Sequence, residues 1–116
     1  MEDAIATGII MAVIGMLIAV LGGLGRARRL PASAMIGIRL PATRASDDAW
    51  EETHVVAGPW LMLAGLVPFL TGILILIPGA SMPEWTVLGA YAAMVVFVIV
   101  GAVLGVRAAN AVNSPS

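Results

Sequence analysis

The stretch that decides the fold is 58-GPWLMLAGLVPFLTGILILIPG-79, which lies in a run without any charged residue. A glycine recurs in it every seventh residue: Gly58, Gly65, Gly72 and Gly79. Because a helix has 3.6 residues per turn, this spacing keeps the glycines on one slowly drifting stripe. About 20 apolar residues suffice to cross the hydrocarbon core of a bilayer. We therefore predict a membrane-crossing helix with a stripe of small residues on one face.

Two further uncharged runs, residues 4–25 and 85–106, are each long enough for one crossing. Between the second and third runs, the sequence IPGASMP at 77–83 contains two prolines and a glycine, which end helices. The pattern predicts an all-α membrane protein of one domain, residues 1–116, with three transmembrane helices. We place the helices at about 4–24, 46–77 and 85–108, and the second enters the bilayer near residue 56.

The composition of the chain supports a membrane protein and excludes several other classes. Of its 116 residues, 60% are hydrophobic and 11% are charged, against about 25% charged in soluble domains. A net charge of −1 provides no basic surface for nucleic acid. The absence of cysteine excludes disulfides, iron–sulfur clusters and thiolate zinc sites.

Small residues mark the faces on which all three helices are expected to pack. Lipid provides no hydrophobic drive between helices, so close backbone approach through small residues replaces it. The predicted packing residues are Gly8, Gly15, Gly22, Gly65, Gly72, Gly101 and Gly105. A tightly packed three-helix bundle is the first interpretation. The alternative is that Gly101 and Gly105 form the contact face of a homo-oligomer.

Two prolines, Pro59 and Pro68, interrupt the second predicted crossing. Each removes a backbone donor and can bend a helix. We favour a single bent helix. The alternative is a short surface helix that ends at Gly58 and is followed by a separate crossing that begins at Pro59.

The arginines predict the orientation in the membrane. Five of the six lie between the first and second crossings, and Arg107 follows the third. The positive-inside rule then places residues 25–54 and the C-terminus in the cytoplasm, and the N-terminus outside. The first helix has acidic residues before it and basic residues after it, so we expect an uncleaved anchor rather than a signal peptide.

The polar segment 25–54 contains the most distinctive residue order of the chain. Its motif IGIRLPATRASDDAWEETH, at 36–54, contains the second copy of an approximate repeat, in which RLPAS at 29–33 matches RLPAT at 39–43. Each proline favours an extended residue before it. Ser46 is a suitable N-cap, and the two aspartates that follow it suit the positive end of a helix dipole.

Trp50 and His54 share one face of this helix with Asp47, at spacings of three and four residues. Ser46, Asp47 and His54 are the residue types of a nucleophile triad. Ser46 and His54 would nevertheless lie about 12 Å apart along the axis, too far for a hydrogen bond. One histidine is also too few for a zinc site. We therefore predict no catalytic, cofactor or metal site.

No ionisable residue falls within a predicted crossing, which argues against a proton-coupled transporter built from this chain alone. The arginines of the motif have two interpretations. Arg39 is either a surface residue, or Arg39 and Arg44 pair with Asp47, Asp48 or Glu51 and fold the segment back on the helix.

The motif resembles the signature of the SdpI family of bacterial integral membrane proteins. The matching residues are Gly37, Arg39, Pro41, Thr43, Ser46, Trp50, His54 and Gly58, where His54 stands at a position at which asparagine is common. The resemblance implies a non-enzymatic protein of the bacterial cytoplasmic membrane, because the named member of the family is an immunity protein against a secreted toxic peptide. That member is also described as a receptor that draws a transcriptional repressor to the membrane.

The expected partners are therefore the bilayer and either a peptide toxin or a cytoplasmic regulator. Two other functions remain open at this point. The first is that of a structural accessory subunit of a larger membrane complex, and the second is that of a component of a transporter.

Overall fold

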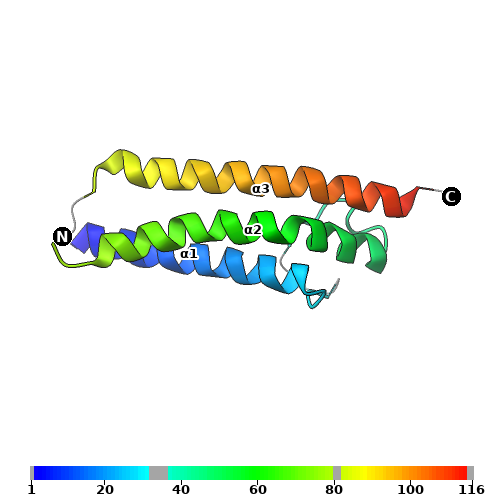
Figure 1. The fold of residues 1–116 in the computed structure, drawn as a ribbon, viewed down its shortest axis with the longest axis horizontal. Helices are drawn as coiled ribbons and strands as arrows, with labels where there is room; N and C mark the ends of the chain where they lie inside the picture. Colours follow the sequence, from blue (N-terminus) through cyan, green and yellow to red (C-terminus); the bar gives the residue numbers. More distant parts are fainter. Residues whose placement is uncertain (1, 32–36, 80–81, 115–116) are drawn as a thin grey trace.

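The computed structural model describes residues 2–31, 37–79 and 82–114. Three helices account for most of this part of the chain: α1 (Glu2–Arg26), α2 (Asp47–Leu76) and α3 (Glu84–Asn113) (Figure 1). Each is long and apolar enough to span a membrane, and the described residues contain no strand. The predicted all-α architecture is confirmed, and α3 continues beyond its predicted end.

The helices run antiparallel to their neighbours along the chain, and α2 lies in the middle (Figure 1). Both α1 and α3 pack on α2, whereas within the described residues the Cα atoms of α1 and α3 do not come within 8 Å of each other. The bundle is 59 Å long and 22 Å by 19 Å in cross-section. The 30 residues of α2 span about 45 Å, so the bundle is longer than the hydrocarbon core, which is about 30 Å thick.

The glycine stripes of α1 and α2 meet in register. Gly8 lies against the carbonyl of Gly72, Gly15 against that of Gly65, and Gly22 against that of Gly58. A Cβ on Gly22 would lie 2.6 Å from the Gly58 oxygen, and a Cβ on Gly58 would lie 2.7 Å from the Gly22 oxygen. Such short separations leave no room for side chains, so the two backbones make the contact themselves. We call these three pairs the glycine seam.

On its opposite side, α2 packs against α3 at two other glycines. A Cβ on Gly101 would lie 2.9 Å from Cβ of Trp60, and a Cβ on Gly105 would lie 2.8 Å from the carbonyl oxygen of Thr53. Both glycines are buried inside the bundle. In this chain α2 covers both glycines. The alternative in which they form the contact face of a homo-oligomer stays a prediction.

The second helix is continuous through both of its prolines. It begins after Ser46, whose side-chain oxygen accepts a hydrogen bond from the amide of Ala49 at 3.0 Å, as the sequence predicts. The interpretation of a separate surface helix before Pro59 is wrong. Pro59 is exposed, whereas Pro68 is buried in the bundle.

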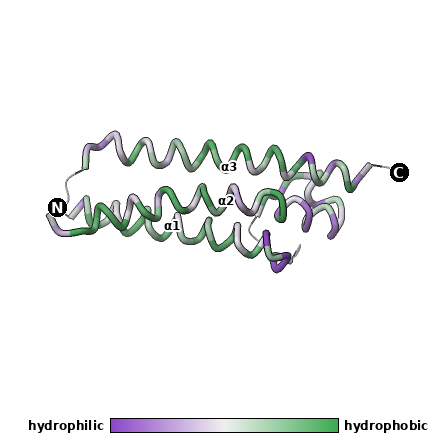
Figure 2. Tube along the Cα trace, in the orientation of Figure 1, coloured by the Kyte–Doolittle hydropathy of each residue, from purple (hydrophilic) through white to green (hydrophobic). Residues whose placement is uncertain are grey.

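Hydropathy divides the molecule into a long apolar body and one polar end (Figure 2). Large aliphatic side chains on the outer faces of α1 and α3 are exposed, such as Leu17, Leu88 and Val96. The polar end contains the end of α1, the start of α2 and the end of α3. All six arginines lie toward this end, and all are exposed, so we call it the arginine end.

Candidate functional site

The segment before α2 folds back onto the first turns of that helix at the arginine end. We call residues 37–46 the cap. Beneath it, Trp50 and His54 are only 2% and 1% exposed, and their ring centroids lie 4.3 Å apart with the planes tilted by 37°. The predicted shared face of these two residues is therefore an inner face, whereas Asp47 is exposed.

His54 joins the cap to α2 through both of its ring nitrogens. The amide of Ile38 donates to Nε2 at 2.9 Å, so Nε2 is the acceptor and carries no proton. Nδ1 lies 2.7 Å from the carbonyl oxygen of Trp50, which can only accept, so Nδ1 is the donor. The hydrogen bonds thus define a neutral imidazole with its proton on Nδ1.

Gly37 is required by both its backbone conformation and its surroundings. Its φ of +126° lies in a region that residues with a Cβ rarely adopt. A Cβ at this position would also lie 2.8 Å from Nε2 of His54 and 3.0 Å from Cη2 of Trp50. The first glycine of the motif therefore lets the chain pass directly over the two buried rings.

Thr43 closes the cap as a local turn. The amide of Thr43 donates to the carbonyl of Leu40 at 3.0 Å, with Pro41 at the second position of the turn, where proline is favoured. The side chain of Thr43 is fully buried. Its Oγ1 accepts from the Leu40 amide at 3.0 Å and lies 2.7 Å from the carbonyl oxygen of Ile38, to which it donates. One hydroxyl thus fixes both sides of the turn.

The tryptophan connects the site to the residues that follow α1. Trp50 Nε1 donates to the carbonyl oxygen of Leu30 at 2.9 Å, and Leu30 is itself buried. Gly25 packs on His54, since a Cβ there would lie 2.8 Å from the His54 Cβ. Among the described residues, no buried side-chain nitrogen or oxygen lacks a hydrogen bond. The cap is therefore a satisfied polar structure rather than a loose connection.

The ion pairs of Glu51 and Glu52 were not indicated by the sequence. Arg28, with a positive φ of 63°, brings its Nη1 to 3.0 Å from an oxygen of each carboxylate. The hydrogen bond to Glu51, and then the one to Glu52, raises the pKa of Arg28 above its ordinary value. Both carboxylates and the guanidinium are well exposed, so we expect these pairs to add little stability.

The remaining residues of the motif have different surroundings. Arg39, Pro41 and Ser46 are exposed on the cap, and Gly58 belongs to the glycine seam, where it also lies close to Arg26. The first copy of the approximate repeat, residues 29–33, is partly outside the described residues. The structure adds residues that the sequence did not single out: Gly25, Leu30, Thr53 and Asn113.

Asn113 and Thr53 had no sequence signal that sets them apart from other polar residues. Asn113 Nδ2 donates to the carbonyl of Ala42 at 2.9 Å and so fastens the end of α3 to the cap. Thr53 is buried and donates to the carbonyl of Ala49 at 2.6 Å, within its own helix. The role of Asn113 depends on the placement of α3 beside the cap.

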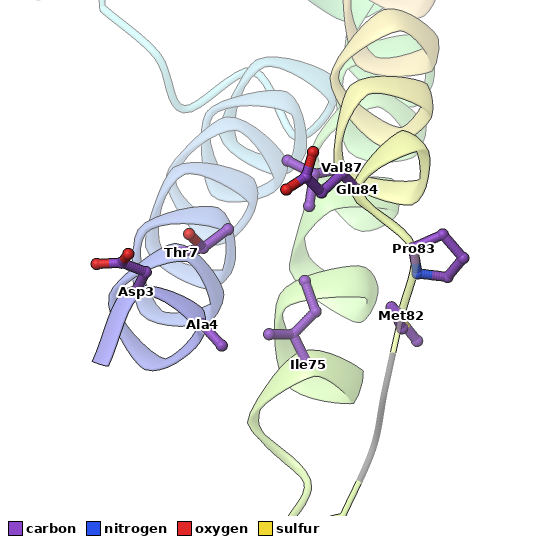
Figure 3. A pocket seen from close by; sticks show the side chains of 8 residues that line it. All are labelled: Asp3, Ala4, Thr7, Ile75, Met82, Pro83, Glu84 and Val87. Atoms are coloured by element: carbon purple, nitrogen blue, oxygen red, sulfur yellow. The ribbon is translucent and has the colours of Figure 1, made fainter. Parts of the chain in front are cut away.

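The opposite end of the bundle contains a separate cavity of about 270 Å³ between the start of α1, the end of α2 and the start of α3 (Figure 3). Its charged residues are Asp3 and Glu84, and the carboxylate of Asp3 points away from that of Glu84 in Figure 3. Within the described ranges, no group of three or more histidine, aspartate or glutamate residues is placed to hold a metal ion.

Comparison with known proteins identifies a family for this chain. The model of the SdpI/YfhL protein family matches residues 29–108, a region that contains the cap, α2 and most of α3. No curated protein and no solved structure matches the chain. The matched region covers more than half of the chain and includes all the motif residues that build the cap. This multi-pass membrane protein therefore belongs to the SdpI/YfhL protein family.

Proposed function

We propose that this protein is a non-enzymatic immunity or signalling protein of the SdpI type in the bacterial cytoplasmic membrane. The observation that carries the proposal is the division of the motif into two sets. Trp50, His54 and Thr43 are buried and build the cap, whereas Arg39 and Leu40 are exposed on it. A rigid polar cap that displays such side chains is suited to binding a partner.

The geometry of the buried residues supports a non-enzymatic role. Both ring nitrogens of His54 are used in hydrogen bonds to backbone groups, so neither is directed at a substrate. Ser46 Oγ accepts the hydrogen bond of the helix N-cap. Ser46 and His54, two of the three residues that would make a triad, are thus engaged in holding the cap and the start of α2.

We propose that the arginine end faces the cytoplasm. The support is the placement of all six arginines toward one end, with Asp3 and Glu84 at the other. The chain has no cysteine, so single cysteines at Ala45 and Glu84, both exposed, are clean reporters. In intact cells, an impermeant thiol reagent should label Glu84→Cys and should leave Ala45→Cys unlabelled until the membrane is opened. The reverse pattern would invert the orientation.

The function is tested by deleting the gene and challenging the cells with secreted peptides from neighbouring strains. We expect the deletion strain to be more sensitive to at least one peptide, and the wild-type gene to restore resistance. Arg39→Ala should abolish protection while leaving the amount of membrane-inserted protein unchanged. Arg29→Ala is the matched control, since Arg29 is an exposed arginine outside the cap, and it should protect normally.

Equal sensitivity of the deletion and wild-type strains to all peptides would contradict the immunity role. If, in addition, a stable partner copurified with the protein in mild detergent, the function would be that of an accessory subunit.

A further inference from the structure

A second surface at the arginine end lies between the cap and α3. Leu40 of the cap is 46% exposed, and with four residues of α3 it encloses a shallow hollow of about 290 Å³. The α3 residues are Ala102, Val103, Val106 and Arg107. All but Arg107 are apolar. Because positions 102, 103, 106 and 107 share one helix face, the hollow runs along the axis of α3.

The two walls of this hollow are held together by the structure. The hydrogen bond from Asn113 to the carbonyl of Ala42 attaches the cap to the end of α3. The turn between Leu40 and Thr43 is fixed by the buried Thr43 hydroxyl. Leu40 is thus kept beside α3 as an exposed leucine, and the hollow is a preformed feature of the bundle.

Arg107 provides a positive charge at one end of the apolar hollow. Its side chain is exposed, and it makes no ion pair or hydrogen bond with the part of the chain that the structure describes. The residue lies six positions before the end of α3, about 9 Å along the axis, whereas Val103 lies one turn deeper toward the middle of the bundle. The long side chain of an arginine near the end of a membrane-spanning helix can extend toward lipid headgroups while its stem stays against apolar surface.

The charge of the arginine end suits an anionic ligand. Six arginines lie toward this end against the four acidic residues of the first turns of α2, Asp47, Asp48, Glu51 and Glu52. Two of these acids are already bound by Arg28. Arg107 makes no ion pair with the described residues, so an anionic lipid headgroup is a suitable source of its counter-charge.

We propose that this hollow binds one anionic phospholipid, with its phosphate on Arg107 and one acyl chain against Leu40, Val103 and Val106. The apolar lining offers a peptide backbone no hydrogen-bond partner, which favours a hydrocarbon chain as the occupant. The proposal requires neither the immunity function nor a particular orientation of the protein in the membrane.

The test is native mass spectrometry of the full-length protein in detergent, titrated with phosphatidylglycerol or phosphatidylcholine. We expect phosphatidylglycerol to bind more tightly to the wild type, with one lipid retained at the lowest concentrations. Arg107→Gln should weaken phosphatidylglycerol binding about fivefold, the factor expected for one arginine at a headgroup. Arg29→Gln removes the same charge outside the hollow and should change the affinity less than twofold.

A second pair of variants tests the apolar part of the site. Val103→Trp fills the hollow without changing the charge and should also weaken phosphatidylglycerol binding severalfold. Val96→Trp, seven residues earlier on α3 and exposed like Val103, is the matched control and should bind normally. Thermal unfolding of all four variants shows whether each is folded, and the arginine pair remains decisive if a tryptophan variant is not.

Three outcomes overturn the proposal. Equal affinities for the two lipids would remove the role of the headgroup charge. Equal losses in Arg107→Gln and Arg29→Gln would mean diffuse electrostatic attraction rather than a site. A dimer that Val103→Trp dissociates and Val96→Trp does not would identify a second copy of the chain as the occupant.

Discussion

The glycine seam and the cap attach other parts of the chain to α2 in opposite ways. In the seam, Gly15 and Gly65 lie face to face and no side chain separates the backbones of α1 and α2. In the cap, large and polar side chains such as Trp50 and His54 are buried and hydrogen bonded. The seam depends on the absence of side chains, whereas the cap depends on specific buried side chains and their hydrogen bonds.

The difference follows from the solvent on each side of the contact. Within lipid, burying an apolar side chain between helices gains nothing over contact with acyl chains, so close packing must provide the attraction. At the arginine end, water and headgroups compete with the protein, so burial of rings and satisfied hydrogen bonds both contribute. The stability of the seam should therefore depend on the size of a substituted side chain, and that of the cap on whether the substituted side chain preserves the hydrogen bonds.

The largest expected effect is that of a side chain placed in the seam. A Cβ on Gly15 would meet the carbonyl oxygen of Gly65 and would lie 2.5 Å from the amide nitrogen of Phe69, and neither backbone atom can rotate away. Gly15→Leu should lower the free energy of unfolding by about 3 kcal/mol or prevent folding. Thermal unfolding in detergent measures the loss. Gly23→Leu, on the same helix with nothing within 4 Å of its Cβ position, should unfold like the wild type.

A smaller loss is expected when the tryptophan of the cap changes. Trp50→Phe removes the donor to Leu30 and leaves that carbonyl unpaired, together with a small cavity. We expect a destabilisation of about 2 kcal/mol. Trp85→Phe is the control, because Trp85 is 70% exposed and should change stability by less than about 0.5 kcal/mol. Similar losses for the two tryptophans would show that Trp50 is not a structural anchor.

Substitutions of His54 distinguish the contribution of its side-chain volume from that of its hydrogen bonds. His54→Leu still fills the space beneath the cap but leaves the Ile38 amide without its acceptor. This variant should lower the free energy of unfolding by about 1–2 kcal/mol. His54→Gln offers an oxygen to the same amide and should cost less. Hydrogen exchange at the Ile38 amide reports the bond directly, and exchange as slow in the leucine variant as in the wild type would refute this role.

The same hydrogen bonds predict the proton position in the wild type. Nitrogen chemical shifts of His54 in labelled protein should show a protonated Nδ1 and an unprotonated Nε2. The opposite tautomer would mean that Ile38 does not donate to the ring.

The smallest effect is expected for the exposed ion pairs of Arg28. Arg28→Gln should lower the melting temperature slightly at low salt and not at high salt, because salt screens exposed charges. Arg44→Gln is the control, since its exposed side chain makes no ion pair within the described residues. A loss for Arg28→Gln that persists at high salt would indicate a role for its unusual backbone conformation instead.

The sequence by itself determined the three helices, the faces on which glycines line up, the N-cap at Ser46 and the family motif. These features depend on local regularities: the helical period, runs without charge, and the geometry of a capping hydroxyl. The glycines of α1 and α2 were therefore predicted as packing residues, although their partners were not.

Only the tertiary structure decided which glycine meets which, and that Gly101 and Gly105 pack against α2. It also decided that His54 accepts from Ile38, and that Arg28 makes an ion pair with Glu51. The physical reason is that these contacts join residues far apart in the chain, and their partners depend on the register and order of the helices. No local pattern around a single residue contains that information.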